Sequence, residues 1–192
     1  MKSKKLLLML IFNFVFISCF HYEVVTIPES GQYKNIHRMT GNFIEISKQS
    51  VGYYGNLQLA SEYRFNQTTQ QYEYSLIVST LAENGLFIQP DTSFELSVTD
   101  TTIQLRRRDN PYHRREVTMN HKKYILETAW FDTEKAILKS LGQAKVVRFS
   151  IQGKTKTIHG KLSEKNIENF RRFSREYLEA IDEEPLNRTQ GM

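Results

Sequence analysis

The chain contains a single cysteine, Cys19, among its 192 residues. One cysteine excludes an intramolecular disulfide framework and any cysteine-rich metal cluster. With only 9 glycines and 4 prolines, the sequence is also unlike collagen and unlike Pro/Gly-rich low-complexity chains. A hydrophobic content of 40% and an aromatic content of 12% can build a packed core, which excludes a wholly disordered chain. The length suits one domain.

The sequence also lacks an apolar run long enough for a transmembrane helix. The run from Leu6 to Ile17, broken only by Asn13, is about 18 Å long as a helix, whereas a bilayer core needs roughly 20 residues. Three lysines precede it: Lys2, Lys4 and Lys5. A short apolar run after basic residues is typical of a secretory signal peptide, so we expect residues 1–18 to be removed.

The end of this run, Phe16-Ile17-Ser18-Cys19, resembles the lipobox of bacterial lipoproteins. A small residue stands directly before the cysteine, while Phe16 replaces the usual leucine. In that family the cysteine thiol receives a diacylglyceryl group, the signal is cut before the cysteine, and the new N-terminus is usually acylated. The resemblance covers the first 19 residues and implies lipidation of Cys19 and a location in the bacterial cell envelope.

The lipobox resemblance implies that the protein binds the membrane through a lipid anchor on Cys19. One acyl chain binds a bilayer marginally, but two or three anchor a protein stably. In the same family an Asp after the cysteine retains many proteins at the inner membrane. Because Phe20 occupies that position, the outer membrane is favoured over the inner membrane.

From Asn42 onward, apolar and polar residues alternate with period two, which is typical of half-buried strands. We expect strands over 43–47, 57–65, 72–78, 93–99, 102–107, 115–120, 123–131, 145–152 and 154–159. Because the connecting loops are short, an antiparallel meander of about seven to nine strands is the natural topology. Residues 22–27 can add a short edge strand.

The last third of the sequence contains two helical patterns. The first covers 134–141, with an apolar face that ends at Gly142. Ser163 is the expected N-cap of the second helix, whose apolar stripe predicts packing on the sheet. The expected fold class is therefore α+β.

The expected domain organisation has four parts. They are a signal peptide at 1–18, a lipidated N-terminus and tether at 19–41, one α+β domain at 42–183 and a disordered tail at 184–192.

Basic residues are concentrated between 104 and 123, although the formal net charge of +5 also includes the signal-peptide lysines. We predict a hairpin tipped by DNPYH at 109–113, with arginines on both arms. The candidate anion-binding residues are Arg106, Arg108, Arg114, Lys122 and Lys123. Their chemistry suggests an anionic glycan or another envelope polymer as partner. The alternative, a solvated sheet edge defended by charge, is favoured because the pleat divides the arginines between two faces.

Tyr53, Tyr54 and Tyr112 are the candidate aromatic surface. The first two stand between Gly52 and Gly55, where adjacent rings can stack on a sugar or contact a protein partner. The alternative is a turn with one ring in the core and the other outside.

Motifs for catalysis and for cofactors are absent from the sequence. It contains no C-x-x-C, no G-x-S-x-G and no phosphate-binding glycine loop, and its five histidines do not have the spacing of a zinc-binding helix. We therefore expect no metal, no cofactor and no nucleic-acid partner, and a non-enzymatic binding or structural module at the membrane surface. Two alternatives remain open: a β-barrel carrier of a small apolar ligand, and an envelope enzyme acting on glycans.

Overall fold

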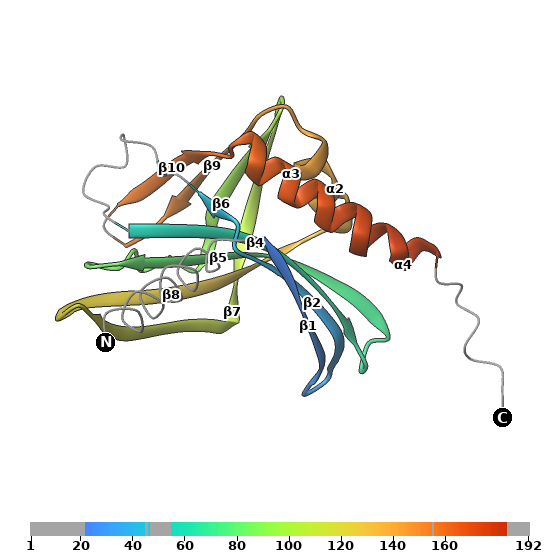
Figure 1. The fold of residues 1–192 in the computed structure, drawn as a ribbon, viewed down its shortest axis with the longest axis horizontal. Coiled ribbons are helices and arrows are strands. Elements are labelled where there is room, and N and C mark those ends of the chain that lie inside the picture. Colours follow the sequence, from blue (N-terminus) through green and yellow to red (C-terminus); the bar gives the residue numbers. More distant parts are fainter. Residues whose placement is uncertain (1–21, 45, 47–54, 155, 184–192) are drawn as a thin grey trace, which may run out of the picture.

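The computed structural model describes residues 22–44, 46, 55–154 and 156–183. These residues form one ten-stranded antiparallel sheet and two helical segments (Figure 1). The predicted α+β meander is confirmed, with one strand more than the upper end of the expected range. No helix within these residues is long and apolar enough to cross a bilayer.

The sheet has the strand order β1-β2-β4-β5-β8-β7-β6-β9-β10, and β3 pairs with β4 beside β2. The strands are β1 (Glu23–Ser30), β2 (Tyr33–Thr40), β3 (Phe43–Ile44), β4 (Gly55–Asn66), β5 (Gln71–Ala82), β6 (Asp91–Val98), β7 (Thr101–Met119), β8 (Lys122–Thr133), β9 (Val147–Gln152) and β10 (Thr157–Lys161). The helices are α2 (Lys135–Gln143) and α3 (Glu164–Phe173), which continues through the π-helical turn η1 (Ser174–Leu178) into α4 (Glu179–Glu183).

The central strands lie where the sequence predicts them, but they are buried on both faces rather than half-buried: residues 59–64 of β4 and 75–78 of β5 are all buried. Leu59 of β4 pairs with Val78 of β5, and Val78 pairs with Ala129 of β8. All three side chains lie on one face of the sheet and are buried in the core. The helices belong to the same apolar cluster through residues such as Leu141 and Phe170, so this face of the sheet is covered by α2 and α3.

The C-terminal helix begins where the sequence predicts. The Ser163 hydroxyl accepts a hydrogen bond from the backbone N–H of Asn166, whose side chain accepts one from the Ser163 backbone N–H in return. Asn166 and Asn169 then both donate to the Oδ1 atom of Asn42, at 2.8 and 2.9 Å. Because Asn42 also donates to the Leu59 carbonyl, these amides fix α3 against β4.

The tether predicted over 19–41 is wrong for Glu23–Thr40, which form the β1–β2 hairpin. This hairpin belongs to the sheet because β2 pairs with β4, and the edge strand expected near 22–27 is the first part of β1. The physical reason is burial: Ile36 and Met39 are both buried apolar side chains, so this segment contributes to the core.

The hairpin tip predicted at 109–113 is also wrong, because these residues lie inside β7. The pairing of β7 with β8 shifts register between Arg107 and Tyr112, which bends the strand. The turn between β7 and β8 is formed instead by Asn120 and His121, both with positive φ. Among the pairings that the structure describes, β7 beyond Arg107 has β8 alone as a neighbour, so this half of β7 is a sheet edge.

Candidate functional site

Three of the predicted anion-binding residues make separate surface ion pairs. Arg106 lies on the first half of β7, whereas Lys122 and Lys123 lie at the start of β8. Their carboxylate partners are Asp91 at 3.6 Å, Glu83 at 3.4 Å and Glu116 at 2.8 Å, respectively. The structure does not bring these three cations to one site.

Arg108 and Arg114 have different surroundings from those three and from each other. The Arg108 side chain is 11% exposed and binds the carboxylate of Asp132. The Arg114 guanidinium lies 4.8 Å from the centre of the Phe87 ring. Of the five predicted cations, only Arg108 belongs to the larger charged cluster described below.

The Tyr112 side chain makes contacts within the protein rather than forming an exposed aromatic surface. Its hydroxyl donates to the Oε1 atom of Glu127 at 2.5 Å, and the Arg107 guanidinium lies 4.2 Å from its ring centre. Burial raises the pKa of Tyr112, and the hydrogen bond to Glu127 raises it further. Cys19 and the tyrosines at 53 and 54 lie outside the described residues.

Glu127 is a fully buried carboxylate that organises a neighbouring loop. It accepts hydrogen bonds from the backbone N–H groups of Leu86, Phe87 and Ile88. Together with the Tyr112 hydroxyl these donors satisfy the charge, so Glu127 is a structural anchor for the loop between β5 and β6.

A second charged cluster lies on the sheet face opposite the helices. Arg38 of β2 is the register partner of Glu62 of β4. The Nε and Nη2 atoms of Arg38 lie 2.6 and 2.5 Å from the Oε2 atom of Glu62. The Glu62 side chain is only 1% exposed, whereas Arg38 is 34% exposed, so the carboxylate depends on this arginine for compensation of its buried charge.

Arg64 continues the cluster along β4. Its Nη2 and Nε atoms lie 2.9 and 3.2 Å from the Oε2 atom of Glu73, and its Nη1 atom lies 3.9 Å from Glu62. Burial alone would raise the pKa of Glu73. The hydrogen bonds from Asn66 and Arg64, with the charges of Arg64 and Arg108, outweigh burial and lower that pKa below its usual range.

Arg108 completes the cluster from the bend of β7. Its Nη2 atom lies 3.4 Å from Glu73, and its Nε atom binds Asp132 of β8. Three arginines and three carboxylates therefore alternate across five strands, and their formal charges cancel. We call this set the arginine–carboxylate chain: Arg38, Glu62, Arg64, Glu73, Arg108 and Asp132.

Trp130 is the aromatic centre beside this chain. It lies on the same face as Asp132, two residues away on β8, and is 5% exposed. The Arg38 guanidinium lies 5.5 Å from the Trp130 ring centre, and the His113 ring meets it edge-on at 5.4 Å. The indole Nε1 atom is buried and has no hydrogen-bond partner among the described residues.

Two adjoining cavities open along the arginine–carboxylate chain. The first, of about 550 Å³, lies between the β1–β2 hairpin and the bend of β7; its lining includes Ile27, Tyr33, Ile36, Arg38, Glu62, Arg64, Asn110, Pro111, His113 and Trp130. The second, of about 480 Å³, is lined by Tyr33, Arg64, Tyr72, Glu73, Tyr74, Arg108, Asn110, Asp132 and Thr133. They share Tyr33, Arg64 and Asn110, so we treat them as one groove.

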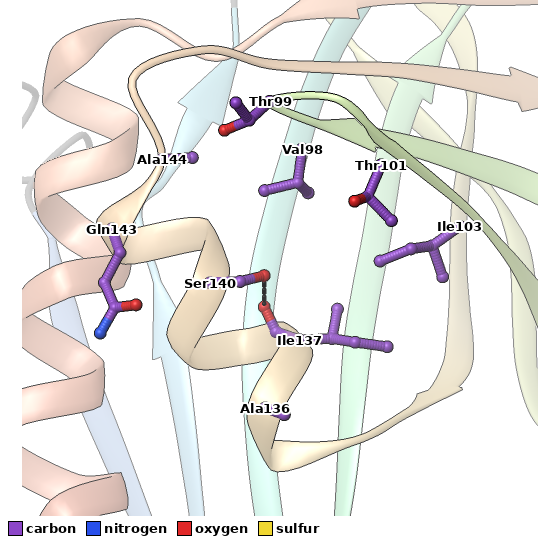
Figure 2. A pocket seen from close by; sticks show the side chains of 9 residues that line it. All are labelled: Val98, Thr99, Thr101, Ile103, Ala136, Ile137, Ser140, Gln143 and Ala144. Atoms are coloured by element: carbon purple, nitrogen blue, oxygen red, sulfur yellow. Dashed lines mark hydrogen bonds between the residues drawn. The ribbon is translucent and has the colours of Figure 1, made fainter.

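A third cavity, of about 430 Å³, lies between α2 and the β6–β7 hairpin (Figure 2). Its lining is Val98, Thr99, Thr101, Ile103, Ala136, Ile137, Ser140, Gln143 and Ala144, which includes no charged side chain. The Ser140 hydroxyl donates a hydrogen bond to the Ile137 carbonyl oxygen at 2.8 Å. Ligand sites combine apolar surface with a few converging polar groups, and the groove fits that description better than this cavity.

Little in the amino-acid sequence indicates the groove. Glu62 and Arg64 alternate with apolar residues on β4 and therefore resemble a solvated strand face. Only the register of β2 against β4 brings Arg38 to Glu62, and only the bend of β7 brings Arg108 to Glu73. Among the residues that the structure describes, no group of three His, Cys, Asp or Glu side chains is arranged to hold a metal ion.

No protein-family model, curated protein or solved structure matches the chain, so neither a family nor a related structure suggests a ligand for the groove.

Proposed function

We propose that the protein is a lipid-anchored binding protein of the bacterial cell envelope. In this proposal fatty chains on Cys19 hold it in the outer membrane, and the groove beside the arginine–carboxylate chain binds its ligand. The observation that carries the proposal is the position of the one cysteine, directly after Ser18 and a short apolar run.

The geometry of the first strand supports a body held close to the membrane. β1 begins at Glu23, four residues after Cys19. Four residues span at most about 14 Å, so the anchor and the sheet are separated by less than half the thickness of a bilayer core. The turn at Gly31, which lines the groove, lies about 26 Å along the strand from Glu23, where β1 begins.

The lining of the groove supports binding rather than acid–base catalysis. A carboxyl group that donates a proton near neutral pH needs a raised pKa, usually from burial without a cationic partner. In the groove the hydrogen bonds and positive charges at Glu73 lower its pKa instead. The ionised form is therefore stabilised, which suits a fixed acceptor of hydrogen bonds.

Metabolic labelling tests the anchor. Wild-type protein and the Cys19→Ser variant, expressed in a Gram-negative host with radiolabelled palmitate, are separated into soluble, inner-membrane and outer-membrane fractions. We expect the wild-type protein to be labelled and to appear in the outer-membrane fraction. The variant should be unlabelled and absent from that fraction. An unlabelled wild-type protein, or a variant that fractionates like the wild type, would contradict the proposal.

A Phe20→Asp variant is the matched control for sorting, because it keeps the lipidated cysteine. It is expected to incorporate palmitate as the wild type does and to move to the inner membrane. Labelled variant that stays in the outer membrane would remove the sorting part of the proposal and leave the anchor intact.

A further inference from the structure

We propose that the groove binds an uncharged saccharide, such as a neutral segment of an envelope glycan. This inference rests on the proposed function, since a body tethered in the envelope is surrounded by polysaccharide. Three properties of the groove support it: its charge balance, its hydrogen-bonding groups and its aromatic walls.

The charge balance disfavours a charged ligand. An anion that bound Arg38 would compete with Glu62, which is 1% exposed and lies 2.5 Å from that arginine. A cation that bound Glu73 would compete with Arg64 in the same way. Either exchange leaves a poorly solvated charge without its partner, which is strongly unfavourable. A neutral ligand leaves these pairs in place.

The hydrogen-bonding groups match hydroxyl groups in particular. A guanidinium carries five N–H donors and a carboxylate about four acceptor sites, so each keeps capacity after one ion pair. Arg38, Glu73 and Asp132 are partly or largely exposed at the groove, and donors therefore alternate with acceptors along it. A hydroxyl both donates and accepts, so adjacent hydroxyls of a sugar ring can bind neighbouring members of the chain.

The walls of the groove add flat, partly apolar surface. Tyr33 is half-buried and lines both cavities, and the Arg64 guanidinium lies 3.7 Å from its ring centre and covers one face. Pro111 and Trp130 line the larger cavity, where Trp130 is 5% exposed. Such rings bury apolar area and still tolerate polar neighbours. The C–H face of a sugar ring can pack on the other face of Tyr33 and on Pro111 while its hydroxyls reach the arginine–carboxylate chain. Two joined cavities suit an oligosaccharide better than a single ring.

A peptide is the competing neutral ligand, and the sheet disfavours it. Extended peptides bind sheets mainly by adding a strand to a free edge. The floor of the groove is formed by β4 and β8, and each of them is paired on both sides. Free backbone groups are therefore not offered to a peptide at this floor. The free edge of β7 borders the groove at Asn110 and Pro111, where the proline has no N–H to donate to an added strand.

Fluorescence of Trp130 tests the inference, because this residue is the only tryptophan in the chain and lines the groove. Full-length lipidated protein in lauryldimethylamine oxide micelles is titrated with N,N′,N″,N‴-tetraacetylchitotetraose, maltotetraose, a heparin tetrasaccharide and tetra-alanine. We expect saturable fluorescence change and reduced acrylamide quenching with at least one of the two neutral oligosaccharides, and affinity that does not fall as NaCl is raised.

Variants separate binding in the groove from binding elsewhere. Tyr33→Ala and Asp132→Asn are expected to weaken oligosaccharide binding about tenfold, as the loss of one hydrogen bond or contact of about 1.4 kcal/mol would do. Arg106→Ala is the matched control, since Arg106 lies on β7 but does not line the groove, and it is expected to bind like the wild type.

Several results would overturn the inference. They are the absence of a Trp130 response to both neutral oligosaccharides, a response to the heparin tetrasaccharide or tetra-alanine alone, or unchanged affinity in a folded Tyr33→Ala variant. If that variant does not fold, acrylamide quenching of the wild-type protein is the deciding measurement. Quenching that neither neutral oligosaccharide reduces would overturn the inference. The protein used in this titration is already lipidated. A negative result therefore rejects the saccharide as ligand but does not contradict the proposal of a lipid-anchored binding protein.

Discussion

Arg38 and Glu62 form a 2.5 Å ion pair in which the carboxylate is buried and the guanidinium is partly exposed. The pair joins the β1–β2 hairpin to the central part of the sheet, because Arg38 lies on β2 and Glu62 on β4. It is therefore both the first member of the arginine–carboxylate chain and a contact that holds one wall of the groove.

Removing the cation from this pair should destabilise the fold. Arg38→Ala leaves Glu62 with Arg64 at 3.9 Å, and we expect a loss of about 2–3 kcal/mol in the free energy of unfolding, reduced from the fully buried case by the exposure of Arg38. Urea denaturation measures the loss. Adding Glu62→Gln removes the uncompensated charge, so the double variant should be more stable than Arg38→Ala alone. A double variant that is less stable would show that Glu62 is not a buried ion in need of its partner.

Glu127 should control the order of the loop between β5 and β6. Glu127→Gln removes one of the two acceptor oxygens that hold three backbone N–H groups, and we expect a loss of roughly 2–3 kcal/mol with faster hydrogen exchange at Leu86 and Ile88. Glu116→Gln, which breaks only the exposed pair with Lys123, is the control and should leave the stability nearly unchanged. Equal effects of the two substitutions would contradict the assignment of Glu127 as a loop anchor.

His37 should make the protein less stable below about pH 6.5. Its ring stacks on Tyr63 at 4.8 Å and lies 5.2 Å from Tyr177, and burial lowers the pKa of His37 from its usual value of 6.5. The unfolded chain then takes up the proton first as pH falls, so stability drops from about pH 6.5 down to the folded-state pKa. His37→Gln should lose this component of the pH dependence. A His37 pKa at or above 6.5, measured by NMR titration, would be inconsistent with this cause.

Gly142 should resist a substitution that normally stabilises helices. Alanine is favoured over glycine in a helix interior by about 1 kcal/mol. At Gly142, however, an added Cβ atom would lie 2.7 Å from the Cα atom of Arg171, where α2 packs against α3. We expect Gly142→Ala to lower the melting temperature, because backbone atoms cannot move aside without separating the helices. A raised melting temperature would show that the helices are less closely packed.

The sequence predicted the elements that a local pattern marks. Leu59 and Val78 lie in segments that largely alternate, although the adjacent Ala60 and Ile77 are apolar and buried on the other face. Ser163 caps its helix through local hydrogen bonds, so the short-range pattern was sufficient to place these elements. It failed at 109–113, because Asp, Asn and Pro mark a bend within β7 as readily as a hairpin turn. It also missed the hairpin at Glu23–Thr40 as a whole, where apolar residues follow no clear period.

The candidate site was less predictable than the fold. Arg108 was identified as a candidate from its place in a basic segment, but its partners Glu73 and Asp132 come from two other strands. Arg38, Glu62 and Arg64 carry no local signal, because a polar residue facing a groove and one facing water occupy the same position in the alternation. Long-range register decides between them.

The N-terminal peptide of protein purified from membranes tests the central claim most directly. Intact-mass and peptide mass spectrometry of that preparation should find a mature chain that begins at Cys19 and carries a diacylglyceryl group, usually with a further acyl chain. A mature chain that begins at another residue, or an unmodified Cys19 thiol, would contradict it.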